Sequence, residues 1–76
     1  MGRETVGQFA ARVKARTGVE MNSMPVRRIP RGVGGAMGPI FAACENVYVC
    51  ATGYPSHVDE DDGTEFFTTF EVVIIE

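Results

Sequence analysis

The chain has 76 residues, of which 45% are hydrophobic and 22% are charged, and its net charge is −3 at neutral pH. These proportions are typical of soluble globular domains and exclude disordered, collagen-like and low-complexity chains. A chain of this length forms only one small hydrophobic core. We therefore expect a single domain of marginal stability over residues 1–76.

The charge is distributed unevenly along the chain. All seven Lys and Arg residues lie within positions 1–31, where only two acidic residues accompany them, so this part has a net charge of +5. Residues 32–76 have eight acidic residues and no basic one, so their net charge is −8. Such an asymmetry indicates either a charged partner or two halves of the fold that neutralise each other, and the sequence leaves both explanations open.

The sequence gives no support for a membrane-bound or secreted protein. Apolar stretches such as Val72–Ile75 are far shorter than the roughly 20 residues that cross a bilayer, and no early apolar run resembles a signal peptide. The pair Met1 and Gly2 matches the start of a myristoylation signal, but Val6 stands where that signal has Ser or Thr. We therefore expect a cytoplasmic protein that does not contact membranes.

The first expected element is a helix over residues 6–17. Thr5 and Gln8 have the spacing of a capping box, in which each residue satisfies a backbone N–H of the other. One side of this helix is an expected buried stripe at helical spacing, formed by Val6, Phe9, Ala10, Val13 and Thr17. Gly18 can adopt the left-handed conformation that ends a helix. The opposite side carries basic residues, so the pattern predicts one buried face and one basic face.

An extended arm and a Gly-rich loop are expected next. Over residues 19–31, Pro25 and Pro30 remove backbone donors and disfavour helical angles in the residues before them, which favours an edge strand or an extended arm. Residues 32–39 contain four glycines, which indicates a loop or a close approach of two backbones. These glycines lack the accompanying residues that dinucleotide-binding and phosphate-binding loops require.

The rest of the chain is expected to form strands. Residues 40–44 are a short apolar run that favours a strand, and residues 47–52 alternate in the manner of a strand. An Asp-Gly pair at positions 62–63 is typical of tight hairpin turns. Residues 64–75 alternate as one long strand, with Phe66 and Phe70 among the side chains expected to face the core. The expected fold class is therefore α+β, with one N-terminal amphipathic helix packed on a small, mainly antiparallel sheet of three or four strands.

Candidate catalytic and metal-binding residues are sparse. Cys44 and Cys50 have a spacing that matches no standard redox or zinc motif, so two reduced, partly buried thiols are expected. His57 is the only histidine, and nothing in the pattern brings it to a cysteine as a general base. The acidic run after it lacks the residues that a calcium-binding EF-hand loop requires. We therefore expect no catalytic residue, no metal, no cofactor and no enzymatic activity.

An acidic cluster marks the expected hairpin turn. It is either a solvated turn that discourages edge aggregation or a knob that docks on basic side chains and imitates the phosphates of nucleic acid. The candidate partner-binding residues are Asp59, Glu60, Asp61, Asp62 and Glu65. Small acidic domains without cofactors are common among phage and mobile-element proteins that block host machinery. We therefore expect an inhibitor of the anti-CRISPR type that occupies a basic, nucleic-acid-binding surface of a larger protein or nucleoprotein complex.

Two other kinds of interaction remain as alternatives. A small regulatory protein could bind nucleic acid through its basic third, although the chain is acidic overall and no aromatic residue is interleaved with the arginines. The candidates for this role are Arg12, Arg16, Arg27, Arg28 and Arg31. The last expected strand is apolar on both faces near its end. Its second face, with Phe67, Val73 and Ile75, must therefore meet the extended arm, a second copy of the chain in a homodimer, or another protein.

Overall fold

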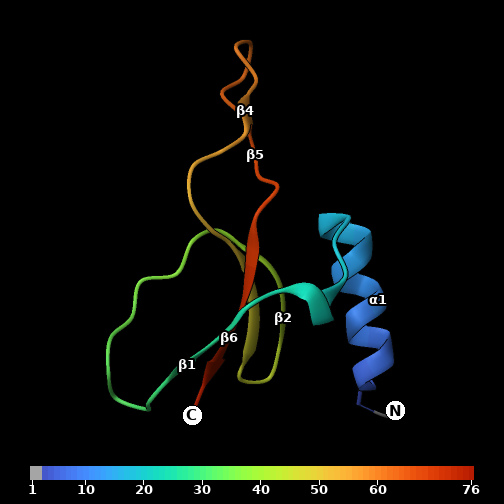
Figure 1. Ribbon diagram of the computed structural model, residues 1–76, viewed down its shortest axis with the longest axis vertical. Coiled ribbons are helices and arrows are strands. Elements are labelled where there is room, and N and C mark those ends of the chain that lie inside the picture. The colour runs from blue at the N-terminus through green and yellow to red at the C-terminus, as the bar shows by residue number, and fades with distance from the viewer. Residues whose placement is uncertain (1–2) are drawn as a thin grey trace.

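The computed structural model describes residues 3–76 as one α-helix packed on a four-stranded sheet, with a two-stranded hairpin projecting beyond it (Figure 1). The elements are α1 (Val6–Thr17), the 3-10 helix η1 (Met21–Ser23), β1 (Val26–Ile29), β2 (Ile40–Cys44), β3 (Val47–Ala51), β4 (His57–Val58), β5 (Glu65–Phe66) and β6 (Phe70–Ile75). The expected α+β class is confirmed. Met1 and Gly2, considered above for myristoylation, lie outside the described residues. Neither helix within residues 3–76 is both long enough and apolar enough to cross a bilayer.

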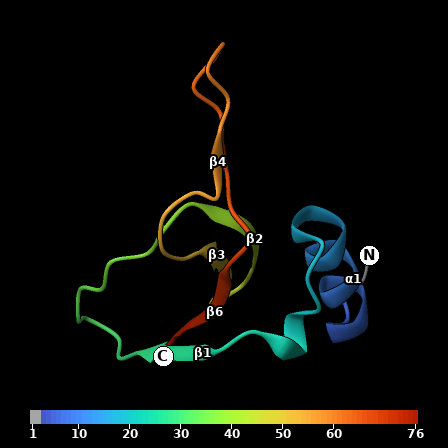
Figure 2. The ribbon, with the colours of Figure 1, turned by 45° about the horizontal axis from the view of Figure 1, so that its top comes forward.

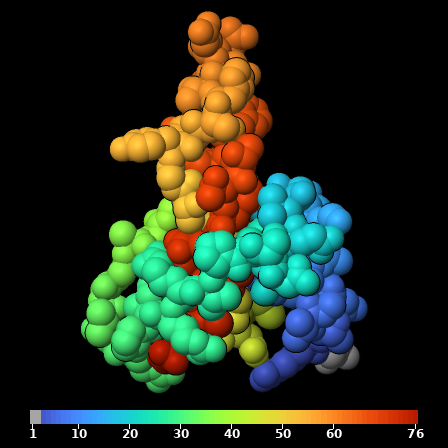
Figure 3. Space-filling view, in the orientation of Figure 1, coloured from blue at the N-terminus to red at the C-terminus, as the bar shows by residue number. Residues whose placement is uncertain are grey.

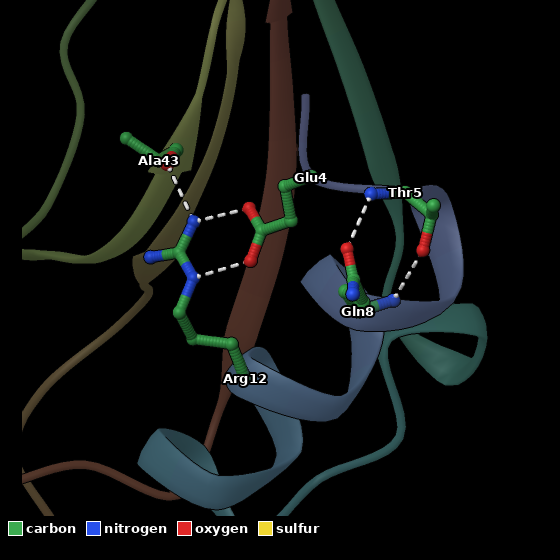
Figure 4. A network of polar contacts seen from close by, with 5 residues as sticks. All are labelled: Glu4, Thr5, Gln8, Arg12 and Ala43. Carbon is green, nitrogen blue, oxygen red and sulfur yellow. Dashed lines mark hydrogen bonds and ion pairs between the residues drawn. The ribbon is translucent and has the colours of Figure 1, made fainter. Parts of the chain in front are cut away.

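Helix α1 has the bounds and the caps that the sequence predicts. The Gln8 backbone N–H donates to the Thr5 hydroxyl at 3.1 Å, and the Thr5 N–H donates to the Gln8 side-chain carbonyl at 2.9 Å (Figure 4). Gly18 ends the helix in the left-handed conformation, with φ 74°. Phe9 is buried against the sheet, whereas Val6, on the same predicted stripe, is 81% exposed. The apolar stripe therefore starts to pack only after the first residues of the helix.

The sheet has the strand order β1-β6-β3-β2. β6 runs parallel to β1 and antiparallel to β3, and β3 forms an antiparallel hairpin with β2. Val26 lies opposite Val72 and Ile29 opposite Ile75, so the segment predicted as an edge strand or arm over residues 19–31 contains an edge strand. The sheet is thus mixed, because two of its three strand pairings are antiparallel and one is parallel.

Different parts of the chain cover the two faces of the sheet (Figures 1 and 2). The face toward α1 holds the larger core, which consists of Phe9, Val13, Met24, Ala42, Val49, Ala51, Phe70 and Val72. The opposite face buries a smaller cluster that consists of Ile29, Cys50 and Val73, with Met37 and Tyr48 packed against it. Val49 and Cys50 belong to different clusters, so the alternation predicted over residues 47–52 is confirmed.

The Gly-rich loop, residues 32–39, has no regular secondary structure, as predicted. It approaches the sheet closely at two positions. A Cβ atom on Gly35 would lie 2.7 Å from the Ile29 side chain, and one on Gly38 would lie 2.1 Å from the Ala51 carbonyl oxygen. Any side chain at position 38 would displace the backbone of either the loop or Ala51, so the structure requires glycine at Gly38.

The single strand predicted over residues 64–75 is wrong, because the structure divides it into β5 and β6. Residues 67–69 lie between these strands, and β5 pairs with β4 outside the main sheet. The reason is the length of the neighbouring strand: β3 ends at Ala51, opposite Phe70, and a Gly and a Pro follow soon after it. Phe66, predicted to face the core, is consequently 48% exposed, whereas Phe70 is 4% exposed.

Candidate partner-binding site

The acidic hairpin, defined as residues 57–66, stands apart from the rest of the molecule. Figure 3 shows it as a narrow column of atoms above a broader body. Its strands β4 and β5 are antiparallel, and the His57 ring stacks on the Phe66 ring opposite it, with the ring centres 5.7 Å apart. Nine of its ten residues are exposed, and Asp59 is half-buried. The hairpin therefore has no core of its own.

Hydrogen bonds within the hairpin shape its acidic loop. The Asp59 N–H donates to the Thr64 carbonyl at 2.8 Å, and the Gly63 N–H donates to the Asp59 carbonyl at 2.9 Å. The carboxylates of Asp59 and Asp62 accept hydrogen bonds from the N–H groups of Asp61 and Thr64. The hydrogen bonds with Thr64 lower the pKa of the Asp62 carboxyl, so its negative charge persists to lower pH. The predicted Asp-Gly turn is present, inside a longer loop than a tight two-residue connection.

Within residues 3–76, the acidic residues of the body form ion pairs, and those of the acidic hairpin do not. Outside the hairpin, every acidic residue forms an ion pair; the pairs are Arg3–Glu45, Arg12–Glu4, Lys14–Glu20, Arg27–Glu71 and Arg28–Glu76. Within residues 3–76, no carboxylate of the hairpin has such a partner. The hairpin has five acidic residues and no basic one, a charge of −5, against seven basic and five acidic residues elsewhere, a charge of +2. Neutralisation within the fold therefore applies to the body, and the excess negative charge is confined to the hairpin.

Arg12 joins the helix to the edge of the sheet. Its Nε and Nη2 atoms donate to the two oxygens of the Glu4 carboxylate, at 3.0 and 2.8 Å, and Nη2 also donates to the Ala43 carbonyl at 2.9 Å (Figure 4). The guanidinium carbon lies 5.1 Å from the centre of the Phe9 ring. The hydrogen bonds from Arg12 lower the pKa of the Glu4 carboxyl. This arginine, a candidate for binding nucleic acid, is thus engaged within the chain.

Arg27 makes an equivalent connection between the sheet and the Gly-rich loop. Its Nε and Nη2 atoms donate to the two oxygens of the Glu71 carboxylate, at 3.1 and 2.9 Å. Nη2 also donates to the Ala36 carbonyl at 2.7 Å. Through this one side chain, β1 is tied to both β6 and the loop that covers the second face of the sheet.

The remaining candidate arginines do not form a free basic patch. Arg28 Nη1 donates to the Glu76 carboxylate at 3.4 Å, and Arg31 Nε donates to the Glu76 backbone carbonyl at the same distance. Arg16 is exposed on α1 and has no ion pair or side-chain hydrogen bond with residues 3–76. Of the five arginines considered for nucleic acid, the structure thus leaves only Arg16 without a partner in the described chain.

The residues considered for self-association do not share one exposed face. Val73 is fully buried in the cluster with Ile29, and Ile75 is half-buried opposite the end of β1. Phe67 packs against the larger core on the other side of the sheet, with its ring centre 6.4 Å from that of Phe41. Of the three possibilities for the second face, the extended arm is present as the adjacent strand β1, whose Ile29 clusters with Val73, and Met37 of the Gly-rich loop packs against this cluster. Contact of this face with a second copy of the chain or with another protein stays a prediction.

The thiols and the histidine lie in different parts of the molecule. Cys44 and Cys50 are free thiols at opposite ends of the β2–β3 hairpin, and they contact different core clusters. Burial raises the pKa of the Cys50 thiol, which disfavours the reactive thiolate. His57 is in the acidic hairpin. Within residues 3–76, no three side chains of His, Cys, Asp or Glu lie close enough together to share a metal ion.

Sequence reasoning missed the region at the base of the acidic hairpin. A groove of about 480 Å³ lies there, between the Gly-rich loop and the segments that lead into and out of the hairpin. Tyr54 lies between Gly53 and Pro55, which both line this groove, and is 96% exposed. The sequence did contain one sign of this exposed region. Tyr54 stands between a glycine and a proline, which favour a turn, and it belongs to no alternating pattern that would bury it.

These features provide the chemistry of a binding surface. Exposed carboxylates attract basic groups over a distance of roughly 8–10 Å at physiological salt. The half-exposed ring of Phe66 adds apolar area within the hairpin, and aromatic residues are favoured in protein interfaces. Comparison of the chain with known protein families, with curated proteins and with solved structures found no match.

Proposed function

We propose that the chain is a non-enzymatic binding protein that docks its acidic hairpin on a basic surface of a larger protein or nucleoprotein complex. The observation that carries this proposal is the separation of charge between the hairpin, whose five carboxylates have no ion-pair partner within residues 3–76, and the body, whose acids are all paired. Complementary charge accelerates association and selects partners. A surface that normally holds nucleic acid is the partner chemistry that best complements this hairpin.

Occupation of such a surface would make the chain an inhibitor, and we propose an anti-CRISPR type of phage or mobile-element protein that acts in the cytoplasm. The carboxylates of the hairpin would take the positions of phosphates, and their binding would exclude nucleic acid by competition. Two features support this role. The loop carboxylates of Asp59 and Asp62 are held by backbone N–H groups, and the hairpin projects beyond the body with nine of its ten residues exposed (Figure 3).

Charge reversal in the acidic loop tests the proposal. A variant with Asp59→Lys, Glu60→Lys, Asp61→Lys and Asp62→Lys should lose the partner that the wild-type chain captures from an extract of its native host. Its circular dichroism spectrum should match that of the wild type, because these residues contribute nothing to the core. Retention of the same partner by the reversed variant would contradict the proposal.

An amide variant separates the charge of the loop from its shape. This variant keeps the size of each side chain and the acceptor oxygens that accept hydrogen bonds from the backbone. Its substitutions are Asp59→Asn, Glu60→Gln, Asp61→Asn and Asp62→Asn. We expect this variant to lose most of the binding as well, because charge and not shape attracts the partner. A gel shift with DNA and RNA at low and high salt provides the control. Retardation at low salt that disappears at high salt would favour binding through the arginines instead.

A further inference from the structure

The groove at the base of the acidic hairpin is built from several segments of the chain. Figures 1 and 2 both place the Gly-rich loop beside the segment between β3 and β4, and the Ala51 N–H donates to the Pro39 carbonyl at 2.9 Å at this junction. The apolar walls include Met37 from the loop, Pro55 ahead of β4 and Phe67 after β5. The volume of about 480 Å³ leaves room for a long side chain of a partner.

Two carboxylates line this groove, and only one of them is available to a ligand. Glu71 is 15% exposed at its side chain and is already neutralised by the two hydrogen bonds from Arg27. Glu65 is exposed and has no ion-pair partner within residues 3–76. A cation that enters the groove therefore meets one unneutralised carboxylate beside apolar walls.

This combination matches the chemistry of an arginine side chain. The stem of an arginine is apolar and can lie along walls such as Met37 and Pro55, while its planar guanidinium pairs bidentately with a carboxylate such as Glu65. The guanidinium also stacks on aromatic rings, and Phe67 is the aromatic residue among those that line the groove. We propose that this groove receives an arginine side chain from the partner on which the hairpin docks, an inference that rests on the proposed function.

A titration of the full-length, isotope-labelled chain followed by nuclear magnetic resonance tests the groove directly. The probe is acetyl-arginine-methylamide, and its uncharged isostere acetyl-citrulline-methylamide is the control. The arginine compound should cause saturable shifts of backbone amides around the groove, at Met37, Gly53, Glu65 and Phe67. The citrulline compound should cause much smaller shifts at equal concentration, because its uncharged urea group can donate hydrogen bonds to a carboxylate but cannot form an ion pair with it.

Two variants and one control sharpen the test. Glu65→Gln should weaken binding of the arginine compound about fivefold, the effect of losing one exposed ion pair. Phe67→Leu should weaken it about threefold, the effect of losing a cation–π contact while an apolar side chain is kept in the groove. Glu45→Gln, which removes an exposed carboxylate of the body that neither lines the groove nor belongs to the acidic hairpin, should leave the affinity unchanged.

Three results would overturn the arginine site: equal shifts with both compounds, shifts confined to the loop Asp59–Asp62, or no shifts at all. The proposed function fails in a different experiment, when charge reversal in the acidic loop leaves capture of the partner intact. If the loop variants lose the partner and Glu65→Gln has no effect on the titration, docking of the hairpin stands and the arginine site does not.

Discussion

The body and the acidic hairpin of this chain are stabilised by opposite means. The body buries side chains on both faces of its sheet and pairs each of its carboxylates with a basic residue. The hairpin buries no side chain fully, and it is held by backbone hydrogen bonds and one stacked pair of rings. Since an isolated two-stranded hairpin is only marginally stable in water, its form depends on the body at its base. Packing therefore does not determine the acidic residues of the hairpin, which leaves them available for recognition.

The same substitution on the two sides of this boundary should give the largest difference in stability. Phe70→Ala in β6 removes a ring that is 4% exposed and should lower the free energy of unfolding by about 3–5 kcal/mol, because a cavity remains in the core. Phe66→Ala in the hairpin should lower it by less than about 1 kcal/mol. Urea denaturation measures both. Similar losses at the two positions would show that the hairpin belongs to the cooperative core.

A pair of glycine substitutions tests the close approach of the Gly-rich loop to the sheet. Gly38→Ala places a Cβ atom 2.1 Å from the Ala51 carbonyl oxygen and should lower the free energy of unfolding by about 1–3 kcal/mol. Gly34→Ala is the matched control, because a Cβ atom at Gly34 meets no atom within 4 Å. It should leave the thermal unfolding midpoint unchanged or slightly raised. A Gly38→Ala variant with the same free energy of unfolding as the wild type would contradict the close approach of the loop to the sheet.

The ion pair between Glu4 and Arg12 should contribute to stability in a way that depends on pH. Its hydrogen bonds lower the pKa of the Glu4 carboxyl below its ordinary value of 4.5 in the folded state. The stabilisation is therefore present above that ordinary value and is lost as the pH falls through the folded-state pKa. Glu4→Gln should be less stable than the wild type at neutral pH and equal to it in strong acid, as measured by urea unfolding. In Glu60→Gln, the control in the hairpin, stability should change little at either pH.

Neutralisation of the acidic loop should have the smallest effect on stability. The amide variant of Asp59, Glu60, Asp61 and Asp62 should stay within about 0.5 kcal/mol of the wild type. At low salt it should be slightly the more stable of the two, because repulsion among the carboxylates is removed, and this difference should vanish at high salt. A large loss of stability at both salt concentrations would instead show that the carboxylates support the fold.

The elements that local signals determine were predictable from the sequence. The capping box of Thr5 and Gln8 and the terminal Gly18 determine the bounds of α1 without reference to the rest of the chain. The five acids of the hairpin were likewise recognised together, because they lie close together in the sequence. The parallel pairing of β1 with β6 was not predicted, since it joins residues such as Val26 and Val72 that are far apart in the chain.

The missed features depend on contacts between distant segments. The alternation of residues 64–75 continues through Phe66 and Phe70, so the division of this strand follows from where β3 ends and not from its own sequence. The neutralisation of the body requires pairs such as Arg27 with Glu71, which are 44 residues apart. The groove at the base of the hairpin combines residues from several segments, so no single sequence motif predicts it.

Site-specific photocrosslinking tests most directly whether the acidic hairpin is the docking element. The photoreactive residue benzoyl-phenylalanine would replace Glu60 in the hairpin in one variant and Arg16 on α1 in another, since both residues are exposed and neither forms an ion pair within residues 3–76. Our account predicts that the partner crosslinks from position 60 and not from position 16, through a segment rich in Lys and Arg. Crosslinks to protein or nucleic acid from position 16 alone would contradict it.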